Sequence, residues 1–282
     1  IQDVLNYLKE TDHEFYRVEK DFSSGTVSMD SQIQGYRGVS TYNSVMNGSV
    51  KEFVNTCYPE FLYMDRNRYT FWPIAQDTFF ASFMGVRYLI SEKPDLDNMK
   101  YELIHQFGKV FLYKNVKETD VARFYENTVS EESLRKLCTG KKRKKNRERI
   151  LENYLVTEDG ADISDLSELT DILEEQKKSA VTLDAAEKDS HLTGSVSAQA
   201  DGYVMCMIPW EKGWTVIVDG EKVQTQKGDL GFLAFQVDKG EHRLELTYQV
   251  PGLKAGMAAG AVCWCVYISI CFYQSRKKRR NL

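Results

Sequence analysis

The chain has 282 residues, which is enough for one or two domains with a sizeable hydrophobic core. Its 28% of charged and 42% of hydrophobic residues are ordinary for a globular protein. Residues 1–250 carry a net charge of −10, because six of the Lys and Arg residues but no Asp or Glu follow Pro251. A body this acidic argues against binding to nucleic acid and against broad adhesion to anionic lipid.

Helix and strand signals alternate in residues 1–115, which predicts a mixed α/β domain. The expected elements are a helix over 1–9, a strand over 14–19, helices over 49–57 and 77–84, a strand over 86–90, and a hairpin of 101–104 with 110–113. Ser49 followed by Glu52 reads as a capping box at the start of the second helix. Asp77 can cap the third helix and Gly85 can end it, because glycine readily adopts the left-handed conformation that follows many helices.

A glycine-punctuated stretch within this domain contains Tyr36, Arg37, Tyr42 and Asn43. The planar guanidinium fork of an arginine beside tyrosines suits phosphate groups or sugar hydroxyls. We therefore treat these four residues as candidate ligand-binding residues. The alternative is that the loop only docks the domain on another part of the protein or on its own strands.

Residues 116–190 differ in composition and read as a charged helical insertion. Helices are expected over 130–138 and 147–155, and the acidic tract 157–178 is expected to pack loosely. The basic run 141–145 lies between the two helices. We expect a solvated loop there, the alternative being contact with an anionic polymer or with lipid headgroups.

Residues 191–252 switch to a period of two, with glycine turns between short runs. The expected strands are 192–199, 202–208, 214–218, 221–226, 231–237 and 242–249. Six short strands at this spacing predict a small antiparallel β-sandwich or jelly roll, and an α+β fold for the chain as a whole. Trp210 and Trp214 flank one of the turns, where they could stack on sugar rings or could instead anchor the sandwich core.

The six cysteines and four histidines form no metal or disulfide pattern. Three of the cysteines lie in the apolar C-terminal segment, and the other three are far apart in the sequence. The histidines are scattered without the spacing of metal ligands. No phosphate-binding loop, dinucleotide motif or nucleophile elbow is present, so we assign no catalytic residue, metal or cofactor to this chain.

The segment 253–273 predicts a transmembrane helix. As a helix its 21 residues would be about 31 Å long, close to the roughly 30 Å hydrocarbon core of a bilayer. Five consecutive cations, 276–280, follow it, and such clusters stay on the cytoplasmic side. The prediction is therefore a cytoplasmic tail over 274–282 and an extracytoplasmic body. Because the chain begins at Ile1 without an export signal, we expect a signal peptide or further spans upstream.

Several sequence blocks together form a specific pattern. They are GYRGVSTYNS at 35–44, MGVRYLI at 84–90, PWEKGWTVIVDG at 209–220, GF at 231–232, KGEHRLELTY at 239–248 and PG at 251–252. With the apolar segment that follows, they resemble the C-terminal end of the YfhO family of bacterial polytopic membrane proteins. The resemblance covers most of residues 10–275, and the chain departs from the family pattern over 140–180.

This resemblance carries its own expectations. The family resembles GT-C-type glycosyltransferases, which implies a many-span membrane domain, a polyprenyl-phosphate-linked sugar as donor, and an outer soluble domain. It also implies the bacterial plasma membrane as location. The implied partners are the membrane, the remaining transmembrane helices of the same protein and a cell-surface glycopolymer such as lipoteichoic acid. Catalytic carboxylates of such enzymes lie in the early membrane part, so none is carried over to this chain.

Two functions remain open on the sequence. In the first, the chain recognises the acceptor or covers the active site of a membrane glycosyltransferase. In the second, it is a non-catalytic, single-span surface protein that binds glycans or a partner protein. The number of spans upstream of Ile1 would separate them.

Overall fold

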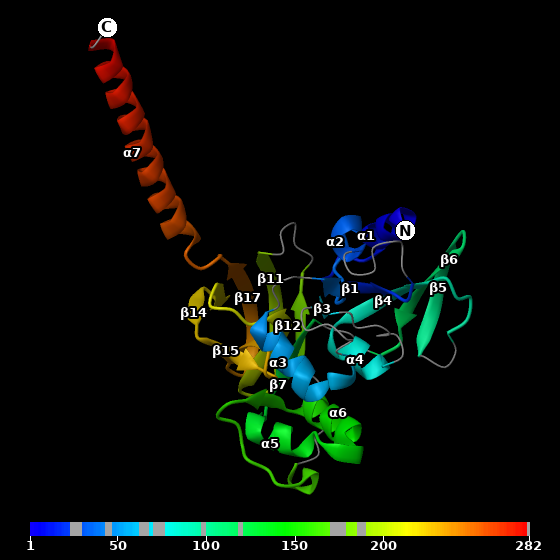
Figure 1. The fold of residues 1–282 in the computed structure, drawn as a ribbon. Coiled ribbons are helices and arrows are strands. Elements are labelled where there is room, and N and C mark those ends of the chain that lie inside the picture. Colours follow the sequence, from blue (N-terminus) through cyan, green and yellow to red (C-terminus); the bar gives the residue numbers. More distant parts are fainter. Residues whose placement is uncertain are drawn as a thin grey trace.

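The computed structural model describes residues 1–22, 30–42, 47–61, 68–69, 77–96, 100–117, 121–169, 179–184 and 190–280. Within these ranges it has helices, several mostly antiparallel sheets and one long apolar C-terminal helix, which confirms the predicted α+β class (Figure 1). Asn43 lies outside the described residues.

The elements follow in chain order. The helices are α1 (Gln2–Thr11), α2 (Asp30–Gln34), α3 (Gly48–Cys57), η1 (Pro59–Phe61), α4 (Thr78–Phe83), α5 (Glu131–Leu137), η4 (Gly140–Lys142), α6 (Arg143–Asn153), η5 (Leu166–Glu168) and α7 (Leu253–Arg280). The strands before the sandwich region are β1 (Arg17–Lys20), β2 (Thr41–Tyr42), β3 (Arg68–Tyr69), β4 (Val86–Ser91), β5 (Tyr101–Phe107), β6 (Val110–Asn115), β7 (Ala122–Tyr125), β8 (Thr128–Ser130), β9 (Leu155–Thr157) and β10 (Ala180–Leu183). The remaining strands are β11 (His191–Ala198), β12 (Gly202–Pro209), β13 (Trp214–Val218), β14 (Glu221–Val223), β15 (Thr225–Gly228), β16 (Phe232–Val237) and β17 (Gly240–Tyr248).

The N-terminal sheet has the strand order β1-β4-β6-β5, with β1 parallel to β4 and the other pairs antiparallel. The predicted hairpin about Gly108 is its β5–β6 pair. α1 buries Val4, Leu5 and Leu8 against this sheet, because these three residues recur at helical spacing. The predicted apolar face of the first helix is thus confirmed.

The caps agree with the sequence at α4 but not at α3. The Asp77 side chain accepts the Phe80 N–H at 2.9 Å, as predicted. At α3 the N-cap is Asn47 and not Ser49: the Asn47 side chain accepts the N–H groups of Ser49 (3.0 Å) and Val50 (3.1 Å). The helix therefore starts earlier than the predicted capping box, since asparagine is as good a cap as serine.

Two antiparallel sheets form the sandwich, with the orders β10-β11-β17-β13-β14 and β15-β16-β12-β7. Their inner faces share one hydrophobic cluster, which includes Val196 and Leu244 from the first sheet and Val204 and Phe235 from the second. The single strand expected over 221–226 is wrong, because β14 and β15 pair in different sheets. β7 and β10 join the sandwich from outside residues 191–252.

The basic run 141–145 is helical and not the expected loop, although four of its five residues are exposed to solvent as expected. It forms η4 and the first turn of α6, which begins four residues before the predicted start. Arg143 pairs with Glu60 at 3.1 Å and Lys144 with Asp77 at 3.5 Å. These carboxylates offset the unfavourable position of cations at a helix N-terminus.

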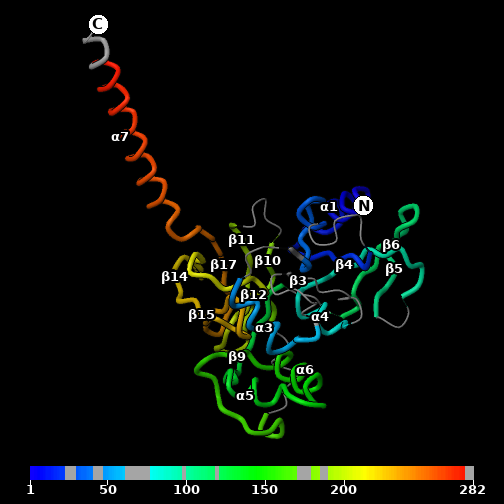
Figure 2. Tube along the Cα trace, in the orientation of Figure 1, coloured from blue at the N-terminus to red at the C-terminus, as the bar shows by residue number. Residues whose placement is uncertain are grey.

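α7 leaves the end of β17 and extends away from the rest of the chain (Figures 1 and 2). Its segment Leu253–Arg276 is long and apolar enough to cross a membrane, and its apolar window is entirely exposed. Within the described part of the chain, one helix is long and apolar enough to cross a membrane, and it is α7. The helix continues through the basic residues that the sequence places in a tail. α5 and α6 lie at the end of the body opposite α7 (Figure 1).

Candidate functional site

The structure places Tyr36 and Arg37 against the N-terminal sheet. The Arg37 guanidinium lies 4.5 Å from the centre of the Phe15 ring, and the Arg37 carbonyl accepts the Val18 N–H at 2.9 Å. Tyr36 packs against the cluster that includes Val18, and burial raises the pKa of its hydroxyl. Tyr42 is described only through its backbone, in β2. The ligand-binding role of these residues stays a prediction.

A buried carboxylate anchors the same loop. Glu19 of β1 accepts the N–H groups of Val39 and Ser40, the latter at 2.7 Å. Desolvation raises the pKa of Glu19, and the two backbone hydrogen bonds oppose that shift. The neighbouring Lys20 is buried in an ion pair with Asp30 of α2. The loop is thus held on its own strand by charged groups that are withdrawn from solvent.

Trp210 and Trp214 lie half-buried against the sandwich core. The Trp214 ring is 5.1 Å from that of Tyr248, at the end of β17 next to α7. Glu211 between the two tryptophans accepts the Tyr248 hydroxyl at 2.5 Å and the Asn47 amide at 2.8 Å. The loop therefore ties the last strand before α7 to the start of α3.

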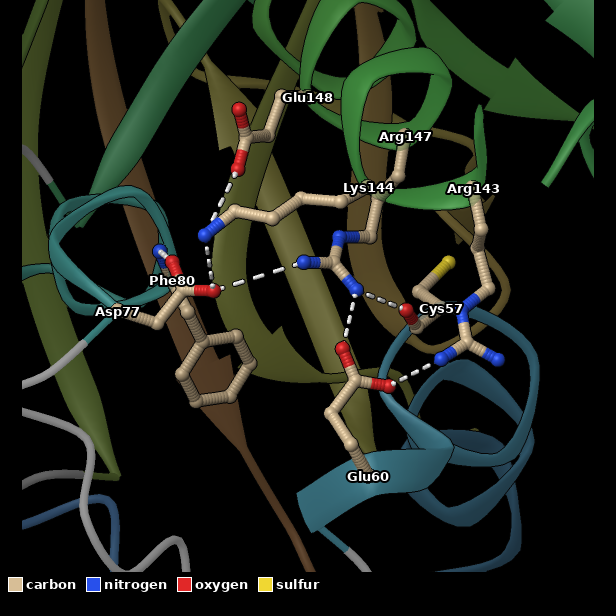
Figure 3. Close-up of polar contacts among 8 residues, drawn as sticks. All are labelled: Cys57, Glu60, Asp77, Phe80, Arg143, Lys144, Arg147 and Glu148. Carbon is tan, nitrogen blue, oxygen red and sulfur yellow. Dashed lines mark hydrogen bonds and ion pairs between the residues drawn. The ribbon is translucent and has the colours of Figure 1, made fainter. Parts of the chain in front are cut away.

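A second polar cluster surrounds Arg147 of α6 (Figure 3). The guanidinium is fully buried, and its Nη1 donates to the Cys57 carbonyl (2.5 Å) and to Glu60 (2.8 Å). Nη2 lies 3.5 Å from an Asp77 carboxylate oxygen, and Cζ lies 3.7 Å from the centre of the Tyr58 ring. Arg147 thus joins the helical insertion to the end of α3 and the start of α4. The sequence does not reveal this packing role, because Arg147 lies in a stretch of charged residues.

A cleft of ≈ 790 Å³ opens at the end of the sandwich remote from α7. Two lining residues show which end this is: Asp219 lies just beyond the end of β13, and His242 lies near the start of β17. At the opposite ends of these two strands Trp214 pairs with Tyr248, and that end is beside α7. The other polar lining includes Tyr203 and three glutamines, which are Gln224, Gln226 and Gln236.

The cleft forms where the inter-sheet core ends. Leu246, Leu244 and His242 follow one another on the inner face of β17, since alternate residues of a strand share a face. The two leucines are completely buried, and the histidine is only half-buried. A polar residue in this inward row keeps the two sheets from closing over a dry core. In the sequence, the signal for this cleft is a polar residue at an inward position of a predicted strand.

His242 and Asp219 form the most strongly paired group of the cleft. His242 Nδ1 lies 2.7 Å from an Asp219 carboxylate oxygen, and Nε2 lies 2.9 Å from the Asp238 carbonyl. Because both partners offer acceptor oxygens, this geometry favours a ring that is protonated on both nitrogens. The hydrogen bond to Asp219 raises the pKa of His242. The hydrogen bond from the Arg243 N–H and, to a smaller extent, the one to His242 lower the pKa of Asp219.

We expect Asp219→Asn to lower the pKa of His242 towards its ordinary value of 6.5. A histidine whose pKa is raised on folding stabilises the folded state below the unfolded pKa, and this contribution is lost as the pH rises through the folded pKa. The variant should lose that pH dependence. NMR titration of the ring nitrogens measures the shift. Asp238→Asn is the comparison: it keeps the carbonyl contact and removes only the weakest of the effects that raise the pKa of His242, so it should lower that pKa less than Asp219→Asn does. An unchanged His242 pKa in Asp219→Asn would contradict the assignment.

The cleft is lined by groups that can form hydrogen bonds. Among its described lining residues are carboxylates, amides, a phenol and an imidazole. Within the described ranges, no group of three or more His, Cys, Asp or Glu residues could hold a metal ion.

Comparison with known proteins identifies the family. The chain matches the family described as bacterial membrane protein YfhO over residues 1–164 and 162–259. It is 35% identical over 89 residues to a protein of Bacillus subtilis (strain 168) named uncharacterized protein YfhO, and these residues are 32% of this chain and 10% of that relative. No solved structure matches the chain. With its long apolar C-terminal helix, the chain belongs to the YfhO family of bacterial membrane proteins.

Proposed function

We propose that this chain is the extracytoplasmic recognition part of a longer membrane glycosyltransferase that takes its sugar from a polyprenyl-phosphate carrier. In this proposal the acceptor is a cell-surface glycopolymer such as lipoteichoic acid, and the sandwich cleft holds a sugar unit of that polymer. Catalysis belongs to the membrane part of the longer protein, and the residues of this chain bind and position the acceptor.

The cleft is the observation that carries the proposal. Its volume of ≈ 790 Å³ lies in the range of pockets that hold small organic ligands. The amides of Gln224, Gln226 and Gln236 both donate and accept hydrogen bonds, as sugar hydroxyls require. Tyr203 offers an aromatic face for an apolar face of a sugar ring. This mixture favours a hydroxyl-rich ligand over a flat apolar one.

The surroundings of the cleft support the orientation in the proposal. The cations Arg276–Arg280 follow the apolar part of α7, and such clusters stay in the cytoplasm. The body would then face outwards, with the cleft at the end remote from the membrane. The cleft could hold one part of an extended polymer while the part that receives the sugar lies nearer the bilayer.

The test is made in the bacterium that encodes the chain, with the full-length gene. We expect Gln224→Ala combined with Gln236→Ala to lower the sugar content of the purified surface polymer by up to about thirtyfold, since each lost hydrogen bond weakens binding by about 1 kcal/mol. Gln106→Ala is the matched control, because this exposed glutamine lies on β5 in the other sheet.

The outcomes separate the two functions. Unchanged sugar content in the double variant, in cells where deletion of the gene abolishes glycosylation, would contradict acceptor binding in the cleft. Unchanged sugar content after deletion of the gene would instead favour a non-catalytic surface protein.

A further inference from the structure

We infer that the cleft selects sugar units that carry a free ammonium group and discriminates against phosphate-bearing ones. The inference rests on the proposed function, because it names the class of ligand that the same cleft takes. It follows from the charges on the lining. Among the described residues that line the cleft there are four carboxylates, from Asp159, Asp219, Glu221 and Asp238, but no lysine or arginine.

One of these carboxylates is already neutralised. Asp219 is paired with the His242 imidazolium at 2.7 Å and also accepts the Arg243 N–H at 2.7 Å. The other three carboxylates, from Asp159, Glu221 and Asp238, form no ion pair with any residue in the described part of the chain. All three are exposed residues at the rim. They leave the cleft with an uncompensated negative charge.

Strand geometry keeps the nearby cations out of the cleft. Glu221 and Val223 of β14 line it, so Lys222 between them points to the opposite face. On β17, His242 belongs to the inner row, so Arg243 belongs to the outer face. The potential inside the cleft is therefore set by carboxylates, and a concave wall of low dielectric concentrates that field.

The shape and the charge together indicate one ligand class. The cleft is much larger than a single cation, and its amides and Tyr203 match sugar hydroxyls and a sugar ring. A carboxylate beside these groups can bind an ammonium substituent through charge-assisted hydrogen bonds. A phosphate group in the same place would meet like charge and lose part of its hydration. An amino sugar satisfies both the polar lining and the charge.

The experiment uses the full chain in phosphatidylcholine nanodiscs and calorimetric titration with three probes. They are a glucosamine tetramer, the N-acetylated tetramer of the same length, and a glycerol-phosphate tetramer. We expect the free-amine tetramer to bind about fivefold more tightly than the acetylated one, as loss of one partly exposed charge contact costs up to about 1 kcal/mol. Added salt should narrow that difference, and the glycerol-phosphate tetramer should bind most weakly.

Matched variants locate the selectivity. Glu221→Gln should abolish most of the preference for the free amine. Glu241→Gln removes the same charge from the outer face of β17, where Glu241 bonds to Ser197, and should leave the preference unchanged. An equal loss in both variants would show a general attraction to the acidic body and would overturn the inference.

The remaining outcomes distinguish the inference from the proposed function. Equal binding of the free-amine and acetylated tetramers would overturn selection for an ammonium group, while acceptor binding in the cleft would stand. Tightest binding of the glycerol-phosphate tetramer would also overturn the inference. Failure of all three probes to bind would overturn both.

Discussion

Replacing Asp229 by asparagine should remove most of the pH dependence of stability between pH 3.8 and about 8. Asp229 is completely buried in the turn between β15 and β16. Its Oδ1 accepts the Val156 N–H at 2.8 Å, whereas Oδ2 has no hydrogen-bond partner. Burial raises the pKa of Asp229 to about 8, against the smaller opposing effects of Val156 and Arg123.

The sign follows from proton uptake. Below pH 3.8 Asp229 is protonated in both the folded and the unfolded chain. Between pH 3.8 and about 8 the unfolded chain releases the proton while the folded chain keeps it, so the free energy of unfolding falls as the pH rises. The whole fall is on the order of 5 kcal/mol, since one pKa unit corresponds to about 1.4 kcal/mol.

Asparagine suits this position for two reasons. Its side-chain oxygen can still accept the Val156 N–H, and it is neutral at every pH. Asp229 and Leu230 have φ values of +47° and +66° in this turn, and asparagine tolerates the left-handed region better than most residues. Urea unfolding of the full chain in detergent micelles across this pH range measures the effect.

The control for this experiment is Asp238→Asn, an exposed aspartate just beyond the other end of β16. It should leave the steep pH dependence in place. If Asp229→Asn and the unchanged chain lose stability equally between pH 4 and 8, Asp229 is ionised in the folded chain and our assignment is wrong.

Replacing Arg147 by alanine should lower the free energy of unfolding by about 3–5 kcal/mol. The substitution removes the fully buried guanidinium and leaves the Cys57 carbonyl and the acidic groups of Glu60 and Asp77 without it. It also removes the contact of the guanidinium with the Tyr58 ring. The loss is large because the Cys57 carbonyl and Asp77 stay behind in a poorly solvated place, although Glu60 keeps its ion pair with Arg143.

A neighbouring arginine provides the control. Arg143 lies one turn earlier on α6, pairs with the other oxygen of Glu60 at 3.1 Å, and is 36% exposed. Arg143→Ala should cost at most about 1 kcal/mol, as exposed ion pairs do. Arg147→Lys should fall between the two, because lysine keeps the charge but cannot reproduce the planar fork. If Arg147→Ala and Arg143→Ala lower the free energy of unfolding equally in urea, Arg147 is not a buried contact that stabilises the packing of α6 on α3 and α4.

Several features of the fold could be read from local sequence. The apolar run 253–273 predicted α7, because its length and composition are properties of one continuous segment. The glycines at 85 and 108 marked a helix end and a hairpin turn, and both have positive φ in the structure. The period of two over 191–252 predicted the strands of the sandwich, since alternation reflects only which face of each strand is apolar.

The candidate site could not be read in this way. Asp159, Tyr203 and His242 line one cleft although they are far apart in the sequence. Trp210 and Trp214 were chosen for their chemistry, and the structure places them at the other end of the sandwich, with Trp214 next to Tyr248. Composition identifies side chains that can bind a sugar, but only strand pairing decides which of them face the same space.

By itself the sequence determined the helix that can cross a membrane, the acidic body, most of the strands and the cap of α4, because periodicity, apolar length and turn chemistry act within a few residues. Only the tertiary structure decided that β7 and β10 complete the sandwich, that β14 and β15 belong to different sheets, and that Arg147 is buried. These outcomes depend on contacts between distant segments. The same contacts decide where the apolar core ends, and therefore where the cleft opens.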